Sequence, residues 1–196
     1  MKIILIVIGI IVTSFIIVQL FAFSGRKNIE SYPYQVKKKY KDFEIRNYEA
    51  NLFTSVKLSS NSYKRSSRKG FSILAGYIFG DNDKNKKIAM TSPVAMSIED
   101  SASTIMMFMV PRKFNKKTLP KPNHSQIYFV EEPAKTVAAI QFSGWADDEK
   151  IDRFQRQLKL ALDMENISYS NKFYFFGYNP PYEFFNRKNE VIVELN

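Results

Sequence analysis

An uncharged run near the N-terminus constrains this 196-residue chain more than any other feature of its sequence. Residues 3–24 carry no charge, and most of them are aliphatic or aromatic. About 20 such residues can span the hydrocarbon of a bilayer, whereas the apolar core of a cleaved signal is usually about 7 to 15 residues long. The run therefore predicts an uncleaved, single-pass membrane anchor at residues 1–24. A cleaved signal is the alternative, because Ala22 and Ser24 are small residues at the spacing of a cleavage site.

Charges flank this run on both sides, with Lys2 before it and Arg26 and Lys27 after it, so the orientation in the membrane stays open. We interpret residues 25–33 as a short polar linker and residues 34–196 as one domain. Hydrophobic periodicity predicts strands at residues 34–40, 43–48, 52–58, 88–98, 104–110, 127–130, 136–142, 173–178 and 191–195. It also predicts two helices, one from Asn61 or Ser62 to Phe79 and one that begins after Asp147.

The order strand, helix, strand, strand occurs twice, in residues 52–110 and again in residues 136–195. A repeated order of this kind predicts a tandem pseudo-repeat within one α+β domain.

The stretch from Gly70 to Met96 combines an apolar helix face with a kinked strand. Helical spacing places Phe71, Leu74 and Ile78 on one face, and a glycine such as Gly80 commonly ends a helix. Pro93 interrupts the following strand, because a proline cannot donate a hydrogen bond within a sheet. Such a helix and strand either line an apolar pocket or simply contribute to the core.

Two motifs in this stretch resemble the SOUL haem-binding protein family: LAGYIFG at residues 74–80 and KIAMTSPV at residues 87–94. Three further segments resemble it in the same order, namely residues 42–46 with Tyr48, residues 119–122, and residues 178–181 with residues 187–190. The resemblance covers about residues 33–195. It implies an antiparallel, distorted barrel-like β structure of two related halves, flanked by two helices.

The resemblance also implies a non-enzymatic protein that sequesters or transports haem, or another tetrapyrrole, reversibly in an apolar groove. A haem site needs apolar walls and cations near its edge for the two propionates. Candidates for the walls are Phe71, Leu74, Ile78, Met90 and Met96, and candidates for the edge are Arg65, Arg68 and Lys69. Further wall candidates are Met106, Met107, Phe108 and Met109. All these apolar residue types also fill protein cores.

Composition narrows the chemistry further. The chain has no cysteine, which excludes disulfides, thiolate metal sites and thioether attachment of haem. Its one histidine, His124, excludes a bis-histidine haem within one chain. The histidine ligation proposed for some SOUL members has no counterpart here, so no axial ligand is predicted. We find no catalytic set of residues and predict that the chain is not an enzyme.

The net charge of +10 favours anionic partners. We find no nucleic-acid-binding motif, so we expect haem and the membrane, but no nucleic acid, as partners of a monomeric protein. Two alternatives to haem binding stay open. The domain could bind another apolar small molecule, as in the related gyrase-inhibitor-like sensor domains, or it could bind an anionic membrane surface without haem.

Overall fold

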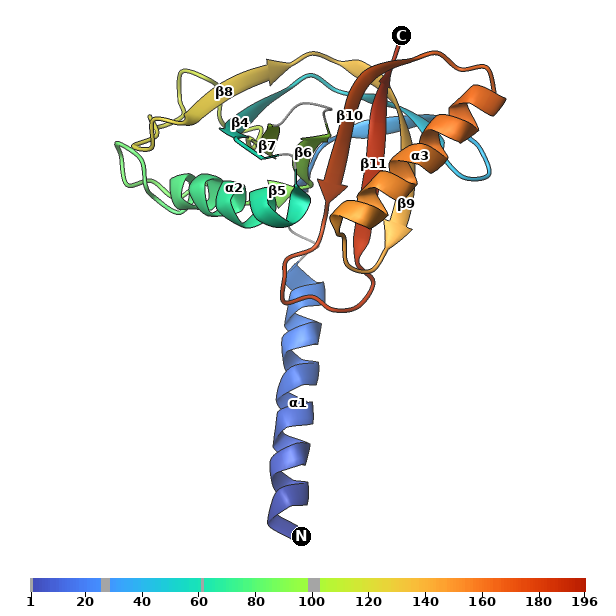
Figure 1. Ribbon diagram of the computed structural model, residues 1–196. Helices are drawn as coiled ribbons and strands as arrows, with labels where there is room; N and C mark the ends of the chain where they lie inside the picture. Colours follow the sequence, from blue (N-terminus) through green and yellow to red (C-terminus); the bar gives the residue numbers. More distant parts are fainter. Residues whose placement is uncertain (1, 26–28, 61, 99–102) are drawn as a thin grey trace.

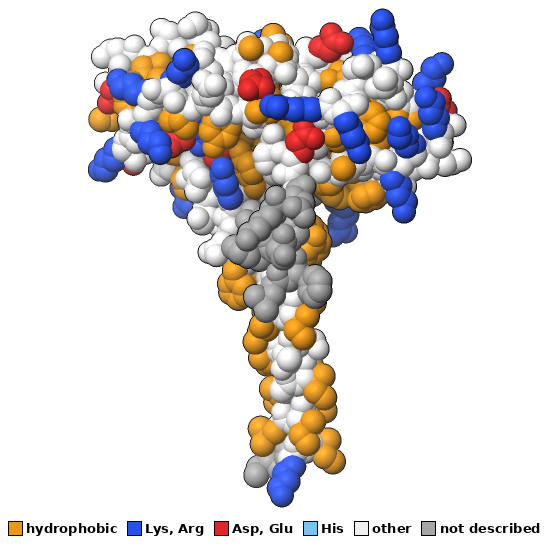
Figure 2. Space-filling view, turned by 180° about the vertical axis from the view of Figure 1, so that it is seen from behind, with side chains coloured by type: hydrophobic (Ala, Val, Ile, Leu, Met, Phe, Trp, Pro, Cys, Tyr) orange, Lys and Arg blue, Asp and Glu red, His pale blue; other side chains and the backbone are white. Residues whose placement is uncertain are grey.

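A computed structural model describes residues 2–25, 29–60, 62–98 and 103–196. A long helix, α1 (Lys2–Gly25), projects from one side of a folded domain (Figure 1). The segment Lys2–Gln19 has a mean hydropathy of 2.5 and is long and apolar enough to cross a membrane, a property that signal sequences share. Apolar side chains cover α1, whereas lysine and arginine are scattered over the visible face of the domain (Figure 2).

Nine strands form one antiparallel sheet in the described part of the chain, in the order β2-β3-β9-β11-β10-β6-β7-β4-β8. Their bounds are β2 (Tyr34–Lys39), β3 (Glu44–Tyr48), β4 (Asn51–Leu58), β6 (Val94–Ile98), β7 (Thr104–Met109), β8 (Ile127–Glu132), β9 (Lys135–Ser143), β10 (Tyr169–Gly177) and β11 (Lys188–Leu195). A short parallel pair joins β1 (Glu30–Ser31) to β5 (Thr91–Ser92). The expected pairing of residues 34–40 with residues 43–48 is confirmed by β2 and β3.

The sheet is built from two halves with the same connectivity. The first half contains β3, β4, α2 (Tyr63–Ile78), β6 and β7, and the second contains β8, β9, α3 (Asp148–Met164), β10 and β11. The halves meet where β6 pairs with β10. The first strand of each half also pairs with a strand of the other half, since β3 pairs with β9 and β8 pairs with β4. The predicted fold class, an antiparallel structure of two halves flanked by two helices, is confirmed.

Both domain helices pack on the same face of the sheet. The α2 helix contacts β4 and β7, and α3 contacts β9, β10 and β11. Leu74 of α2 and Leu158 and Leu162 of α3 are fully buried in one core cluster with residues from both halves. On the expected buried face of α3, Ile151 is also buried, while Phe154 and Ala161 are half-buried.

The two helices are capped differently at their starts, and Asp148 in the first turn of α3 contacts the first turn of α2. Asp147 caps α3 by accepting a hydrogen bond from the Lys150 backbone N–H (2.8 Å), as the sequence predicted. Ser62 stands at the N-cap of α2, but its side chain makes no capping bond there. Instead, the carboxylate of Asp148 from α3 accepts hydrogen bonds from the backbone N–H groups of Tyr63 and Lys64. The cap of one helix is thus supplied by the other.

Three local expectations differ from the structure. The strand expected at residues 88–98 begins only at Thr91, because the Ile88 N–H bonds to the Ile78 carbonyl (2.8 Å) and closes the end of α2. Residues 25–33, interpreted as a linker, contain β1 and the buried Tyr32. Helix α2 ends at Ile78 rather than at Phe79. The expected left-handed glycine is present, since Gly80 has a φ of +121°.

A second core cluster lies on the other face of the sheet, away from α2 and α3. It is formed by Tyr32, Tyr48, Phe53, Ala95, Met107, Met109, Val137, Ala139, Phe176 and Ile192. The alternation of side chains along a strand explains the division. In β7, for example, Met106 and Phe108 belong to the helix-side cluster, whereas Met107 and Met109 belong to the opposite one.

Candidate functional site

The basic residues expected at the edge of the site lie on the outer surface of α2. Arg65, Arg68 and Lys69 are exposed, and so is Lys64. Residues three and four positions apart share one side of a helix, so Arg65, Arg68 and Lys69 project together. In the part of the chain that the structure describes, these four side chains form no ion pair. Their charges are therefore available to an anionic group.

One apolar ring lies beside these cations. Phe71 is three residues beyond Arg68 and is 38% exposed, which is unusual for a phenylalanine. Its ring packs edge-to-face against Phe108, with the ring centroids 5.4 Å apart. The outer surface of α2 therefore presents an anchored aromatic ring next to a cluster of positive charge.

The remaining predicted wall residues lie beneath this surface. Leu74, Ile78 and Met96 are buried in the helix-side core, and Met90 is half-buried against it. Gly70 shows how closely α2 approaches the sheet, because a Cβ at this position would lie 2.8 Å from the Leu58 Cδ1 atom. The space between helix and sheet is thus filled by protein side chains.

The loop that carries His124 contacts the loop that follows α2. Asn123 Nδ2 donates a hydrogen bond to Asp81 Oδ1 (2.9 Å). The His124 imidazole is tied locally, since its Nδ1 accepts from the Gln126 backbone N–H at 3.3 Å. The 16-residue helix α2 is about 24 Å long. His124 therefore lies toward the C-terminal end of α2, whereas Arg65 lies near its start.

Two of the family-like segments meet in a buried ion pair on the face opposite the helices. Arg46 of β3 donates two hydrogen bonds to Glu190 of β11, from Nη1 to Oε2 and from Nη2 to Oε1, each 3.0 Å long. The Tyr178 hydroxyl donates to Glu190 Oε2 at 2.6 Å. Both Arg46 and Glu190 are almost completely buried. These residues join the first strand of one half to the last strand of the other.

The surroundings of Glu190 keep its carboxylate charged. Burial alone would raise the pKa of Glu190, but hydrogen bonds and the charge from Arg46, together with Lys188 and Tyr178, lower it below its ordinary value. Burial and the charge of Glu190 raise the pKa of Tyr178 well above its ordinary value, so this hydroxyl keeps its proton. The cluster is a stable structural joint with no group poised to exchange a proton near neutral pH.

The other family-like segments are also joined to each other. The Tyr77 hydroxyl donates to the Pro120 carbonyl at 2.8 Å, and burial raises the pKa of Tyr77 to about 12. Asn82 is buried in the loop after α2, where its Nδ2 donates to the carbonyls of Tyr77 (3.0 Å) and Lys86 (2.8 Å). The LAGYIFG motif and residues 119–122 therefore hold the end of α2 in place.

A cavity of about 290 Å³ lies on the face opposite the helices. It is lined by Ser97, Ile105, Met107, Tyr128, Val130, Glu132, Asn171, Lys172, Phe173 and Tyr174. This volume is just below the roughly 300–1,000 Å³ of typical small-molecule sites. A tetrapyrrole, with four linked pyrrole rings, is too large to be enclosed there without movement of the strands.

Small side chains explain this cavity. Ser55 of β4 lies between Met107 and Tyr128 in the register of the sheet, and Ser97 lines the cavity from β6. The buried Ser55 hydroxyl has no hydrogen-bond partner among the described residues. The sequence analysis missed this cavity, because a serine within a strand is a weak signal without knowledge of its cross-strand neighbours.

The part of the chain that the structure describes contains no group of three or more histidine, aspartate or glutamate side chains that could hold a metal ion. Its most buried ionisable cluster, Arg46 with Glu190, is an ion pair between strands.

Comparison with known proteins gives a consistent result. The family model of the SOUL heme-binding protein matches residues 29–194. "Heme-binding protein 2" of Homo sapiens is 30% identical over 161 residues, which cover 79% of this chain and 78% of that protein. "Heme-binding protein 1" of Sus scrofa is 26% identical over 174 residues, which cover 84% of this chain and 92% of that protein.

Solved structures share the fold at low identity. The EcmrR C-terminal domain has a TM-score of 0.62 and 13% identity, covering 83% of this chain and 98% of that one. A hydrolase from Listeria innocua has a TM-score of 0.52 and 9% identity, covering 82% of this chain and 94% of that one. At these identities the likeness concerns the fold alone.

Proposed function

The chain belongs to the SOUL heme-binding protein family, and on this premise we propose that it is a membrane-anchored, non-enzymatic protein that binds haem reversibly. The observation that carries the proposal is the exposed surface of α2, where the exposed cations Arg65, Arg68 and Lys69 precede the partly exposed ring of Phe71. Haem presents a flat apolar face and two carboxylates, so it needs both kinds of contact.

The residues of α2 fit haem as a surface ligand. Arg65, Arg68 and Lys69 would bind the propionates, and Phe71 would pack against the edge of the ring. Leu74, Ile78, Met90 and Met96 would form the floor that fixes Phe71 in place. Because α2 has no histidine and His124 lies toward the other end of the helix, apolar contact and ion pairs would hold the group. Haem supplies the iron and the conjugated ring, and the protein supplies solubility and reversible release.

A hemin titration of a fragment that begins near Lys27 tests this proposal. We expect the fragment to be soluble and monomeric and to show a shifted Soret band at stoichiometric hemin. Replacing Arg65 and Arg68 with alanine should weaken the binding of hemin more than the binding of a propionate-esterified porphyrin, and salt should narrow the difference. Equal losses for both ligands, or no loss, would contradict the assignment of the propionate site.

The cavity supports a second candidate function, the binding of a small, mainly apolar molecule. Its walls include Ile105, Met107 and Val130, and Ser55, whose hydroxyl has no partner among the described residues, pairs with the lining residues Met107 and Tyr128 in the sheet. A naphthalene sulfonate dye whose fluorescence rises on binding would probe it. The half-buried Ile105 can be replaced by tryptophan to fill the space. Loss of dye binding with hemin binding intact would separate the two sites, whereas unchanged dye binding would exclude the cavity as the dye's site.

We also propose that residues 1–24 stay on the mature protein as a single-pass anchor. The contact of Gln19 with residues of the β10–β11 loop supports this, because cleavage after Ser24 would remove it. N-terminal sequencing of protein isolated from membranes decides the question, and a mature start at Gly25 would contradict it.

A further inference from the structure

The loop between β10 and β11 exposes a group of aromatic side chains. Tyr182 is 55% exposed, Phe184 50% and Phe185 62%. Trp145, which precedes α3, is 50% exposed, and its ring centroid lies 5.8 Å from that of Phe184. We call these four residues the aromatic patch. Large apolar side chains that are exposed together commonly mark a binding surface.

The backbone that carries the patch is held firmly. Arg187 Nη1 donates to the carbonyls of Pro180 (2.9 Å) and Glu183 (2.6 Å), and Arg187 Nη2 donates to the Asn179 carbonyl (3.2 Å). The Arg187 guanidinium also lies 3.9 Å from the centroid of the Trp145 ring. The aromatic side chains are therefore exposed on an ordered loop rather than on a loose one.

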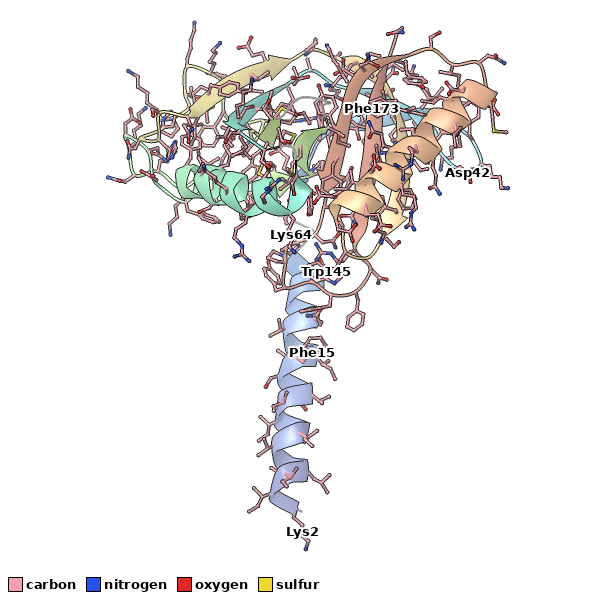
Figure 3. All side chains as sticks on the ribbon, viewed as in Figure 1. Lys2, Phe15, Asp42, Lys64, Trp145 and Phe173 are labelled. Carbon is pink, nitrogen blue, oxygen red and sulfur yellow. The ribbon has the colours of Figure 1, made fainter. Side chains whose placement is uncertain are left out.

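The patch contacts α1 directly. Gln19 Nε2 donates to the Tyr182 carbonyl (2.9 Å), and Gln19 Oε1 accepts from the Phe184 backbone N–H (3.1 Å). The Phe15 ring lies 5.7 Å from the Phe184 ring and 6.3 Å from the Phe185 ring, between centroids. Figure 3 shows Phe15 on α1 below Trp145, where the loop meets the helix. Gln19 carries the only side-chain amide in the sequence of α1.

These contacts define the level of the patch along α1. The segment Lys2–Gln19 is 18 residues long, or about 27 Å, which is close to the roughly 30 Å of the hydrocarbon core. If this segment spans the bilayer, Gln19 lies at the boundary and Phe15 about 6 Å below it. Aromatic rings at that depth match the belt that tryptophan and tyrosine form at membrane interfaces. The Gln19 amide satisfies two backbone groups that would otherwise enter a layer poor in water.

The basic residues on this side of the domain also suit contact with a membrane surface. Figure 3 places Lys64, at the start of α2, on the side of the domain from which α1 projects. Arg65, Arg68 and Lys69 follow on the exposed surface of α2. Basic residues close to a membrane anchor are attracted to anionic headgroups.

We propose that the aromatic patch docks the domain onto the bilayer that holds α1, with the rings of Phe184 and Phe185 at the boundary between acyl chains and headgroups. The partner is a lipid surface that contains anionic headgroups. The proposal rests on the membrane anchor of the proposed function. Docking fixes the domain at the surface, with the start of α2 close to the lipid.

Trp145 provides the test, because it is the only tryptophan of the chain. The full chain is reconstituted into vesicles of phosphatidylcholine and phosphatidylglycerol with brominated acyl chains, and its fluorescence is recorded. We expect blue-shifted emission, quenching by bromine near the headgroups more than by bromine near the chain ends, and protection from aqueous iodide. Replacing Phe184 and Phe185 with serine should restore iodide quenching, while Leu160→Ser, at an exposed apolar residue of α3, should not.

The outcomes separate docking from anchoring. If the chain floats with the vesicles but Trp145 is quenched by iodide and not by bromine, the patch does not dock and the anchor stands. If the chain does not float with the vesicles, both the proposed membrane anchor and the proposed docking are wrong. If the Phe184 and Phe185 variant keeps the lipid quenching of the native chain, another surface positions Trp145 and the proposal fails.

Discussion

The helices α2 and α3 occupy the same place in the two halves of the domain, yet only one of them follows the usual rules for a helix start. They are similar in length, 16 and 17 residues, and both bury leucines against the same core. In α3, Asp147 caps the first turn and acidic residues follow it, which suits the helix dipole. The α2 helix has no cap of its own and begins with basic residues, which opposes the dipole.

This difference between the helix starts indicates that α2, rather than α3, carries the functional site. Cations at the start of a helix are unfavourable unless something else requires them, and violations of local rules tend to occur at functional sites. Asp148 offsets the cost by capping α2 from α3. The cations of α3 are occupied, since Arg156 pairs with Asp152 and Arg153 lies over the Phe154 ring. The cations of α2 are open to a ligand.

The opposite face of the sheet shows the same asymmetry. In one part, the buried pair of Arg46 and Glu190 links β3 to β11 across the intervening β9. In the other part, Ser55 and Ser97 leave a cavity of about 290 Å³. On this face of the sheet, one part is thus joined by a buried ion pair and the other part contains a cavity.

The largest loss of stability is expected when the buried pair of Arg46 and Glu190 is broken. Glu190→Gln removes the buried carboxylate that pairs with the Arg46 guanidinium and leaves only the part-exposed Glu44 as a charged partner, and breaking a buried pair costs about 3–5 kcal/mol. The free energy of unfolding from chemical denaturation measures this, with the exposed Glu149→Gln as the control. A loss below about 1 kcal/mol, as for a surface ion pair, would mean that the joint is not essential.

The same substitution should change the response to acid. The pKa of Glu190 is lowered in the folded state, so the ion pair stabilises the fold above the ordinary pKa of 4.5. That stabilisation is lost as the pH falls through the lower, folded-state pKa. In Glu190→Gln the free energy of unfolding should therefore fall less steeply below about pH 4.5 than in the native chain. Parallel curves would contradict the assigned pKa shift.

The next effect compares the cores under the two helices. Leu74→Ala in α2 and Leu158→Ala in α3 should each cost about 2–5 kcal/mol in the haem-free protein, because both side chains are fully buried. A much smaller loss for Leu74→Ala would show that α2 lies over an open slot when no ligand is bound. Thermal or denaturant unfolding of both variants measures the difference.

A smaller effect is expected at the shared cap. Asp148→Ala should cost about 0.5–2 kcal/mol by removing the acceptor for the first turn of α2. Its neighbour Glu149→Ala should stay within about 0.5 kcal/mol. Hydrogen exchange should also quicken in the first turn of α2 more than in that of α3. Equal exchange rates in both first turns would show that α2 does not need this cap.

The smallest effect is expected at His124. His124→Ala should leave hemin affinity within a few fold, because the histidine lies toward the end of α2 away from Arg65. A loss above about tenfold, or roughly 1.4 kcal/mol, together with a changed Soret maximum would identify it as an axial ligand.

Periodicity predicted the helices, most strands and the repeat, because these depend on local patterns. It missed the start of β5, since the Ile88 N–H bonds to the end of α2, a contact between residues ten positions apart. It also treated Leu74, Ile78 and Met96 as possible pocket walls, because burial against protein and burial against a ligand require the same residue types.

Periodicity could not predict the ion pair of Arg46 and Glu190 or the contact of Gln19 with the aromatic loop. The partners in each contact lie more than 140 residues apart in the sequence. The family-like segments gave the only signal of the joint. They contain both of its partners, yet nothing in their spacing shows that they meet.

The assignment of haem to α2 rather than α3 is the central claim, and one matched pair of variants tests it most directly. Arg65 with Arg68 and Arg153 with Arg156 are exposed pairs with the same spacing on equivalent helices. Hemin titration of the two double alanine variants, followed by the Soret band, compares them. We predict that the Arg65 and Arg68 variant binds hemin at least about tenfold more weakly, which corresponds to roughly 1.4 kcal/mol, while the Arg153 and Arg156 variant binds as the native chain does. Equal affinities in both variants would contradict the account.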